Sequence, residues 1–424
     1  MNEHRLPEDE FAKKMATVLS PSHAIDSVEL LKGRDAQLSE IRRAWHQIGR
    51  QIFIYGYRGV GKTSLAQTAA HQQQSSDQHP IRVICEENGT FTKVVHDIFC
   101  RAFPADPRIL KQKLDAAVGL KVGTFSAEMR QSIEAGIPPE PKSINEAVLI
   151  TKFLMSFHSA HPVIIIDEFD MLKNKSEAAK FASYIKELGD SSINVKFIFC
   201  GIGEAIDTFF ATHESAYRQF HTVKLERLDF DPRLEIIKSA SEALNIFIDK
   251  TTALRIARVS DGFPHFIHLI CEKLFWIIYE DSPDLKVRAD HFERAINNAV
   301  SVIEPYLKKP YEKATQTYSN DCEEILWAVA DDHQLQRPTK EIISSYERIM
   351  RTRGKEPLAK NTFYSRMNQM KTEARDSILI GTRSGWYEFR EKMMRGYARM
   401  RATQERVELD VEHPLQKKKF QREN

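Results

Sequence analysis

Short apolar runs and amphipathic patterns alternate along the first half of the chain. Five runs predict strands, at residues 51–55, 81–85, 163–167, 195–200 and 222–225. Between them, apolar residues recur at spacings of three and four, as at Leu38, Ile41 and Trp45, which predicts helices. An uninterrupted run such as 163–166 is typical of a parallel strand that is buried on both faces. We therefore expect an α/β fold with a doubly wound parallel sheet over residues 29–225.

The second half of the chain has a different pattern. Residues 226–305 show helical spacing only, with turns at Gly262 and Pro283, and predict a small all-α bundle. Three helical patterns follow, the third at 358–374 with Phe363, Met367, Met370 and Ala374 on one face. A glycine-centred hairpin is predicted at 378–389, so that residues 306–409 read as a winged helix-turn-helix.

Three further segments carry weaker patterns. Residues 1–28 are polar and contain two prolines, which indicates an N-terminal arm. Residues from about 104 to 141 are interrupted by glycines and prolines and are interpreted as an insertion in the α/β core. Residues 410–424 are interpreted as a basic, solvated tail.

The first predicted strand runs into a glycine-rich loop and then into a helix, which is the context that a phosphate-binding loop requires. Lys62 would bridge the β- and γ-phosphates of ATP, and the Thr63 hydroxyl would contact Mg²⁺. Backbone N–H groups of the loop would approach the phosphates, helped by the positive end of the helix. The alternative is a glycine-rich turn that binds nothing, and the Lys–Thr pair argues against it. The nucleotide-binding candidates of this Walker A segment are Gly56, Arg58, Gly59, Val60, Gly61, Lys62, Thr63 and Ser64.

Two carboxylates end the buried strand at 163–167, about a hundred residues after the loop. Asp167 would hold the Mg²⁺ shell, and Glu168 would orient or deprotonate the attacking water, as in a Walker B motif. A pair of strand-end carboxylates that only face solvent is the alternative. The two motifs together predict an ATPase with ATP and Mg²⁺ as cofactors.

Charge and composition indicate where the protein is located and which kind of partner it could bind. The net charge is only +2, but residues 337–401 contain 16 Lys and Arg against seven Asp and Glu, an excess of +9 that leaves −7 for the remainder. Such an asymmetry suggests that the C-terminal part meets an anion, most commonly nucleic acid. The five cysteines form no CxxC pair and are interpreted as reduced core residues. No apolar run is long enough for a membrane span, and we expect a cytoplasmic protein.

Together, the residues before the first strand (Leu31–Asp35 in the sequence), the two Walker motifs, the helical lid and the winged helix resemble the AAA+ superfamily. The resemblance is closest to the branch that holds initiator-type (origin-recognition-like) ATPases and the STAND signalling ATPases. It implies that Gly33 and Arg34 lie near the adenine, and that Arg218 acts as an arginine finger on a neighbouring subunit's γ-phosphate. Arg218 would then make the ATP-loaded protein a homo-oligomer; the alternative is a surface arginine at a helix end.

Two positions depart from the family pattern. Cys200 stands where a polar sensor residue usually ends the fourth strand, and the lid reads Gly262-Phe263-Pro264-His265 where many members have an arginine. A Gly-x-Pro lid is similar to STAND ATPases, and Pro264 and His265 would contact the nucleotide there. Histidine in the lid core is the alternative for His265. These departures favour slow hydrolysis and a nucleotide that acts as a switch.

The winged helix offers a DNA-binding surface. Helix-turn-helix proteins place the third helix in the major groove and flanking cations on phosphates. The candidates are Lys360, Asn361, Tyr364, Lys371 and Arg383. We therefore expect an ATP-dependent, DNA-associated switch; a signalling or scaffold ATPase whose winged helix contacts protein remains the alternative.

Overall fold

The computed structural model describes residues 5–20, 29–47, 49–74, 78–103, 126–191, 193–203, 216–303, 305–316 and 322–410, together with Ser27 and Arg108. The chain divides into two compact units. One comprises residues 24–57 and 61–226; the other comprises residues 1–23, 58–60 and 227–424. The predicted ATPase core, residues 29–225, falls in the first of these units except for residues 58–60, and residues 227–424, which include the predicted lid and winged helix, fall in the second.

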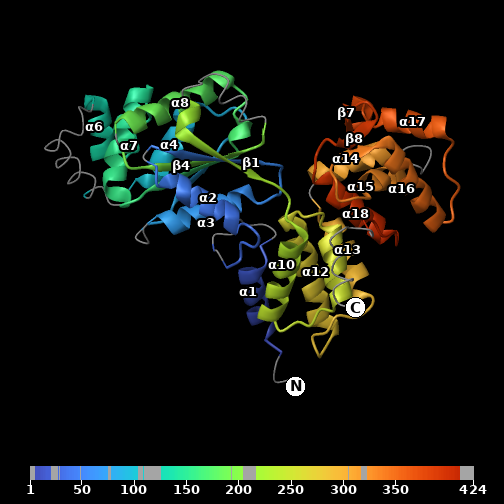
Figure 1. The fold of residues 1–424 in the computed structure, drawn as a ribbon. Coiled ribbons are helices and arrows are strands. Elements are labelled where there is room, and N and C mark those ends of the chain that lie inside the picture. Colours follow the sequence, from blue (N-terminus) through green and yellow to red (C-terminus); the bar gives the residue numbers. More distant parts are fainter. Residues whose placement is uncertain are drawn as a thin grey trace. The chain divides into compact units, whose positions relative to one another are not determined.

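The first unit is built on a five-stranded parallel sheet, as predicted (Figure 1). The strands are β1 (Gln51–Gly56), β2 (Ile81–Ile84), β3 (Val163–Asp167), β4 (Lys196–Gly201) and β5 (Phe220–Leu225). Their order across the sheet is β2-β3-β4-β1-β5. Parallel strands end at one edge, so the sheet brings the ends of β1, β3 and β4 together.

Helices cover both faces of this sheet (Figure 1). On one face lie α4 (Phe91–Ala102), α7 (Ile144–His158) and α8 (Lys175–Asp190), with α6 (Ala127–Glu134) beside them. On the other lie α2 (Asp35–Trp45) and α3 (Lys62–Gln73). Edge-to-face aromatic contacts, such as those of Phe169 with Phe53 and Phe199, lie in the core between the sheet and the helices α4, α7 and α8. In the predicted insertion, α6 is described, while residues 104–107 and 109–125 lie outside the described residues.

The second unit begins with a helix that the sequence pattern did not reveal. Residues Glu8–Val18 form α1, which buries Phe11 and Met15 against the lid. Phe11 stacks on Tyr279 and meets Trp276 edge-on. Part of the segment predicted as an arm is thus a helix that packs on the lid. The lid itself consists of α10 (Phe230–Ala243), α11 (Lys250–Val259), α12 (Pro264–Asp281) and α13 (His291–Ser301).

Residues 305–410 form what we call the C-terminal subdomain. Its helices are α14 (Pro305–Thr315), α15 (Cys322–Ala330), α16 (Thr339–Thr352), α17 (Lys360–Gln369) and α18 (Met394–Gln404). Its strands β6 (Arg337–Pro338), β7 (Leu379–Arg383) and β8 (Trp386–Phe389) make an antiparallel sheet in the order β6-β8-β7. Three helices interleaved with a small sheet are consistent with the predicted winged helix. Because two prolines at 305 and 310 read as a boundary, the sequence pattern missed α14.

Helix α17, predicted at residues 358–374, is shorter than predicted. It ends at Gln369, and both Lys371 and Ala374 lie beyond it. A turn follows, in which Asp376 and Ser377 adopt positive φ angles of 52° and 45°. This turn redirects the chain into β7. The prediction of a single apolar helix face from Phe363 to Ala374 was therefore wrong, and Ala374 is exposed.

A buried ion network joins the lid to α18. Asp261, 1% exposed, pairs with Arg227, with Arg395 (Oδ2 to Nε, 3.1 Å) and with Arg399 (3.5 Å). Burial alone would raise the pKa of Asp261, but these three guanidinium groups, together with that of Arg233, lower it to about 2. The carboxylate is therefore charged at neutral pH, and α18 is fixed to the lid.

The turn that presents Asp261 requires glycine at the next position. Gly262 has a φ of 79°, and a Cβ there would lie 2.7 Å from the Leu228 carbonyl oxygen and 2.8 Å from Arg233. The predicted Gly-x-Pro turn thus has a structural reason in the lid itself. Among the described residues, no helix is long and apolar enough to cross a membrane. Cys85, Cys200, Cys271 and Cys322 are buried free thiols, and Cys100 is exposed.

A buried histidine in the lid predicts how stability depends on pH. His268, 3% exposed, accepts a hydrogen bond at Nδ1 from the Ser20 amide (3.4 Å). Burial, with a smaller contribution from His265, lowers the pKa of His268 from 6.5 to about 4. Between pH 6.5 and pH 4 the unfolded chain therefore binds a proton that the folded chain excludes. The free energy of unfolding should fall by about 3 kcal/mol across that window, and this group should cause no further decrease below it.

The measurement is the unfolding free energy of the wild type and of His268→Phe between pH 7 and pH 4. The phenylalanine keeps a ring but cannot titrate, so the variant should be less stable at pH 7 and show a shallower acid slope. Parallel slopes in the two proteins would contradict the prediction.

Candidate functional site

The phosphate loop links β1 to α3 and depends on glycine for its conformation. Gly59 and Gly61 have φ angles of 75° and 94°, and Gly61 is the residue that immediately precedes α3. Lys62 begins that helix, and its ammonium group donates to the carbonyl oxygens of Gly56 (3.1 Å) and Tyr57 (2.9 Å). These loop carbonyls neutralise part of the lysine's charge where phosphate oxygens would otherwise do so. Thr63 and Ser64 follow on the first turn of α3 and are half-buried.

Asp167 joins the two Walker motifs. It ends β3, is 2% exposed, and its Oδ2 accepts a hydrogen bond from the Thr63 hydroxyl at 2.8 Å. Its Oδ1 accepts from the Glu168 amide at 3.0 Å. The predicted metal-binding pair thus converges across about a hundred residues of sequence.

Glu168 is exposed and has a left-handed backbone, with a φ of 52°. This conformation turns the chain out of β3 into the short 3₁₀ helix η1 (Phe169–Met171). The turn separates the directions of the two adjacent carboxylates: Asp167 is held inside, while Glu168 faces solvent. Such a division suits one carboxylate that positions a cation and one that meets water.

The position expected for a polar sensor holds a buried thiol. Cys200, on β4 between β1 and β3, is fully buried, and its thiol donates to the Lys62 carbonyl at 3.9 Å. Burial, reinforced by Asp167, raises the pKa of this thiol well above its usual value, so it stays neutral. Asp170 ties down the segment after β4, accepting at Oδ1 from the Ile202 amide (3.2 Å). Glu204 lies outside the described residues.

Four other residues were predicted to contact the nucleotide, and they lie outside the phosphate loop. Gly33 has a φ of 68°, and Arg34, 5% exposed, donates through Nη2 to the Glu226 carbonyl at 2.7 Å. The guanidinium of Arg34 thus ties the entry of α2 to the end of β5, and its place near an adenine stays a prediction. Pro264 and His265 form the first turn of α12 in the other unit, both half-buried. Their role at the nucleotide also stays a prediction.

Arg218 lies on η2 (Ala216–Gln219), immediately before β5, and is exposed. Residues 204–215, which include the start of the motif at Ser215, lie outside the described residues. The role of Arg218 as an arginine finger stays a prediction.

The predicted DNA contacts are all exposed but do not form one helical stripe. Lys360, Asn361 and Tyr364 lie on α17 and are exposed, whereas Phe363 and Met367 of the same helix are buried.

The other two candidates lie at the small sheet. Lys371 follows the end of α17, and its Nζ lies 5.4 Å from the Tyr387 ring on β8. The Arg383 guanidinium lies over the Trp386 ring, 3.7 Å from its centroid, where β7 turns into β8. The interpretation of Lys371 as a third-helix residue was therefore wrong, and both Lys371 and Arg383 lie beside rings of β8.

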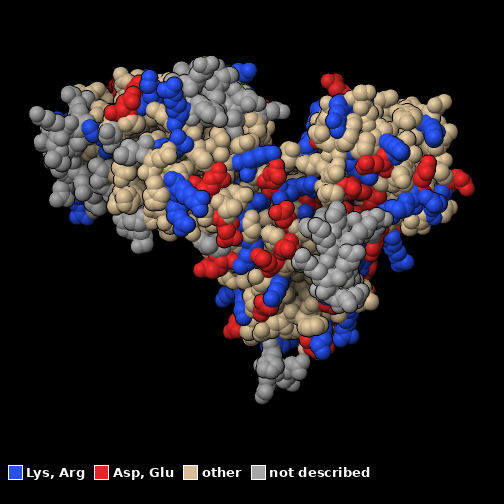
Figure 2. Space-filling view, in the orientation of Figure 1, with Lys and Arg blue, Asp and Glu red and all other residues tan. Residues whose placement is uncertain are grey.

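The basic excess of residues 337–401 is only partly on the surface. Arg337, Lys392, Arg395 and Arg399 are buried, between 0% and 7% exposed. On the face drawn in Figure 2, Lys and Arg side chains are interspersed with Asp and Glu over the C-terminal subdomain. The sequence-level excess thus overstates the positive charge that a partner would meet.

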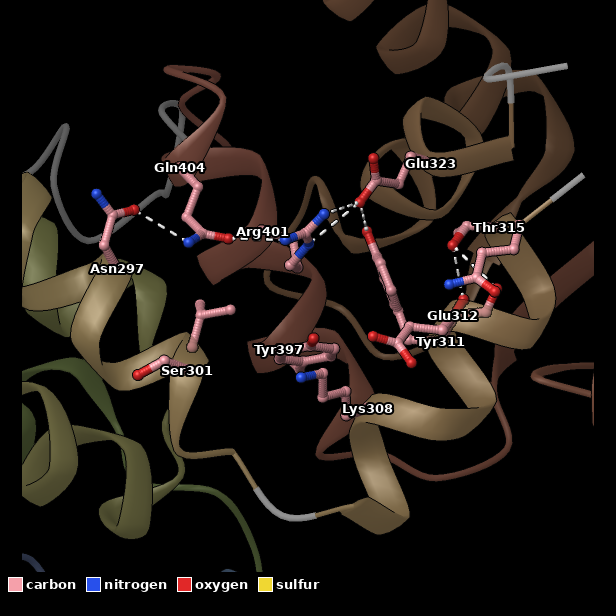
Figure 3. Close-up of a pocket in the computed structure, with 12 residues that line it drawn as sticks. Asn297, Ser301, Lys308, Tyr311, Glu312, Thr315, Glu323, Tyr397, Arg401 and Gln404 are labelled. Atoms are coloured by element: carbon pink, nitrogen blue, oxygen red, sulfur yellow. Dashed lines mark hydrogen bonds and ion pairs between the residues drawn. The ribbon is translucent and has the colours of Figure 1, made fainter.

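A separate cavity of about 920 Å³ lies within the second unit, between α13 of the lid and helices α14 and α18 (Figure 3). Its polar groups bond one another. Arg401 and the Tyr311 hydroxyl both donate to Glu323, and Gln404 donates to Asn297. This cavity lies where the lid meets the C-terminal subdomain, and its lining residues are far in sequence from the Walker motifs.

Arg82 is a residue of the site that sequence reasoning missed. It interrupts the apolar run of β2, and its guanidinium reaches Asp167 Oδ2 through Nη2 (2.8 Å) and Nε (3.2 Å). An arginine between buried apolar residues of a strand is a signal that could have identified it, because a charge in that setting requires a partner.

Comparisons with known proteins agree with this geometry. Residues 30–198 match the family described as AAA ATPase domain. No curated protein matches the chain in sequence. The Walker-type ATPase of Pyrococcus abyssi is similar in structure, with a TM-score of 0.53, 16% identity, and coverage of 89% of this chain and 99% of that one. The ORC2 protein of Aeropyrum pernix, solved as ADPNP-ADP complexes, gives a TM-score of 0.51 and 11% identity over 92% of this chain and 98% of that one.

At such identities the two structures report the fold, and the family match reports the domain. The phosphate loop, the buried Asp167 and the parallel sheet supply the chemistry that both imply. Residues 30–198 therefore match an AAA ATPase domain that carries the phosphate loop, and the fold of the chain is similar to those of the Walker-type ATPase of Pyrococcus abyssi and the ORC2 protein of Aeropyrum pernix.

Proposed function

We propose that this ATPase is a slow nucleotide-dependent switch that assembles when ATP is bound and holds duplex DNA through its C-terminal subdomain. The observation that carries the DNA part is the exposed polar surface of α17 around its buried residues Phe363 and Met367. Lys360, Asn361 and Tyr364 lie there, and Arg383 extends the surface at the β7–β8 turn. A helix with one face in the core and one free polar face is what major-groove recognition needs.

The nucleotide site fits ATP and Mg²⁺ by the chemistry of its donors. A threonine hydroxyl and a carboxylate 2.8 Å apart are hard oxygen ligands of the kind Mg²⁺ prefers. When bound, the ion would neutralise charge on the phosphates, held by Thr63 and Asp167. The ammonium group of Lys62 would then donate hydrogen bonds to the phosphate oxygens instead of the loop carbonyls, and Glu168 would orient the attacking water.

Slow hydrolysis follows from Cys200. The buried neutral thiol is bonded to the Lys62 carbonyl and offers no polar contact to the γ-phosphate or to the attacking water. One group that commonly stabilises the transition state is therefore lacking at this strand end. A long-lived ATP state suits a switch better than a motor.

A signalling or scaffold ATPase is a second candidate, with a specific observation in its favour. The charges on the visible face of the C-terminal subdomain are mixed (Figure 2), and Tyr364 is 42% exposed. Mixed charge around an exposed aromatic also suits a protein partner.

The Walker residues give a first prediction. Lys62→Ala should abolish ATP binding, because backbone amides alone cannot balance the phosphate charge. Glu168→Gln should bind ATP normally but hydrolyse it about a hundredfold more slowly, since the water loses its base. Equilibrium binding of a fluorescent ATP analogue and phosphate release are the measurements. Glu134→Gln, an exposed glutamate of α6, is the control, and equal turnover in the wild type and Glu168→Gln would exclude the role of Glu168.

Assembly gives a second prediction. Arg218→Ala should bind ATP normally yet hydrolyse it poorly, because the missing guanidinium acts on the neighbouring subunit. Mixing Arg218→Ala with Lys62→Ala should restore part of the activity, since each chain supplies the half-site that the other lacks. Arg42→Ala, an exposed arginine of α2, should behave as the wild type. A wild type that stays monomeric with ATP at micromolar concentration in light scattering would rule this out.

DNA binding gives a third prediction. Lys360→Glu and Arg383→Ala in the full-length protein should weaken duplex binding and leave ATP binding unchanged. Removal of one cation that pairs with a phosphate should lower the slope of log affinity against log salt by about one. Binding should tighten with ATP, because assembly joins several weak sites.

Lys238→Glu, on an exposed part of α10, is the matched control for charge. Titration of a labelled duplex at several salt concentrations is the measurement. If the wild type assembles with ATP but binds DNA no more tightly than the Lys360→Glu variant, the scaffold function is favoured instead.

A further inference from the structure

The charge balance around Asp167 contains a cation that the Walker motifs do not account for. Arg82 donates to Asp167 Oδ2 through two nitrogens, at 2.8 Å and 3.2 Å, and the Thr63 hydroxyl donates to the same oxygen at 2.8 Å. The other carboxylate oxygen accepts the Glu168 amide. Both oxygens of the carboxylate are therefore engaged by the chain itself.

The position of Arg82 is fixed by the sheet. β2 pairs with β3 in parallel, with Arg82 opposite Ile165 and Ile84 opposite Asp167. Its neighbours Ile81 and Val83 are buried in the apolar core, whereas the side chain of Arg82 remains 34% exposed. The guanidinium thus lies at the rim of the nucleotide site, where it can leave the carboxylate for solvent or for another anion.

We propose that Arg82 is a built-in counter-ion that competes with Mg²⁺ for the Asp167 carboxylate. A carboxylate that is only 2% exposed needs a cation beside it. In the nucleotide-free chain Arg82 supplies that charge. Loading of the metal–nucleotide complex requires the guanidinium to release Oδ2, and Arg82 is a positioning residue that sets how much Mg²⁺ the site demands.

This inference rests on the proposed nucleotide chemistry, and its test separates the two. Arg82→Gln removes the competing charge but keeps a polar side chain. The Mg²⁺ concentration that half-saturates its response to a fluorescent ATP analogue should be about tenfold lower than in the wild type, because one charge-assisted contact no longer opposes the metal. Arg82→Lys, which keeps the charge but not the two-nitrogen contact, should lie between them.

A second measurement does not depend on turnover. Without nucleotide, Arg82→Gln should melt at a lower temperature than the wild type, because Asp167 loses its partner. Mg²⁺ alone should raise the melting temperature of Arg82→Gln more than that of the wild type. Arg42→Gln removes the same charge from an exposed site on α2 and should match the wild type in both experiments.

The outcomes are distinct. A wild type that does not bind the ATP analogue at any Mg²⁺ concentration would overturn the nucleotide proposal itself. If the wild type binds but Arg82→Gln and Arg82→Lys need the same Mg²⁺ as the wild type, the competition is overturned and the nucleotide proposal stands. A higher Mg²⁺ requirement in both variants would likewise overturn it, because Arg82 would then assist the metal by orienting Asp167.

Discussion

A single buried carboxylate organises the nucleotide end of the sheet. Asp167 lies at the end of a strand that is buried on both faces, where an unpaired charge would be costly. Two groups from other elements donate hydrogen bonds to this carboxylate: the hydroxyl of Thr63 on α3 and the guanidinium of Arg82 on β2. Because β1, β3 and β4 are parallel neighbours, the phosphate loop and the buried Cys200 thiol are brought to the same edge. The carboxylate therefore couples three elements that are far apart in the sequence.

A second buried carboxylate plays the corresponding part in the other unit. Asp261 gathers Arg227, Arg395 and Arg399 at the turn between α11 and α12, and the positive φ angles of Asp261 and Gly262 present it there. Gly396 on α18 allows a close approach to Phe266, since a Cβ would meet that ring at 2.5 Å. The lid and the C-terminal subdomain are thereby held together by charge and by packing.

The same network explains why the charge count of the C-terminal region misleads. Four of the cations between residues 337 and 401 are internal, and Arg395 and Arg399 are balanced by Asp261, which lies outside that window. Burial lowers the pKa of Arg395 to about 9, yet it stays charged at neutral pH. Those cations stabilise the fold and are not available to DNA. The cations that a DNA partner could meet are the exposed ones, such as Lys360 on α17 and Arg383 at the β7–β8 turn.

The sequence by itself determined the parallel α/β core, the phosphate loop, Asp167 and Glu168, because apolar runs, glycine spacing and strand-end carboxylates are local signals. It also predicted the lid helices and the order of helices before the hairpin. Helices α1 and α14 and the end of α17 were decided by tertiary structure, since Phe11, Met15 and Tyr311 become core residues only against distant partners. The partners of Arg82, Arg34 and Arg395 were likewise beyond a linear reading. A side chain's charge is written in the sequence, but which opposite charge neutralises it depends on contacts that only folding creates.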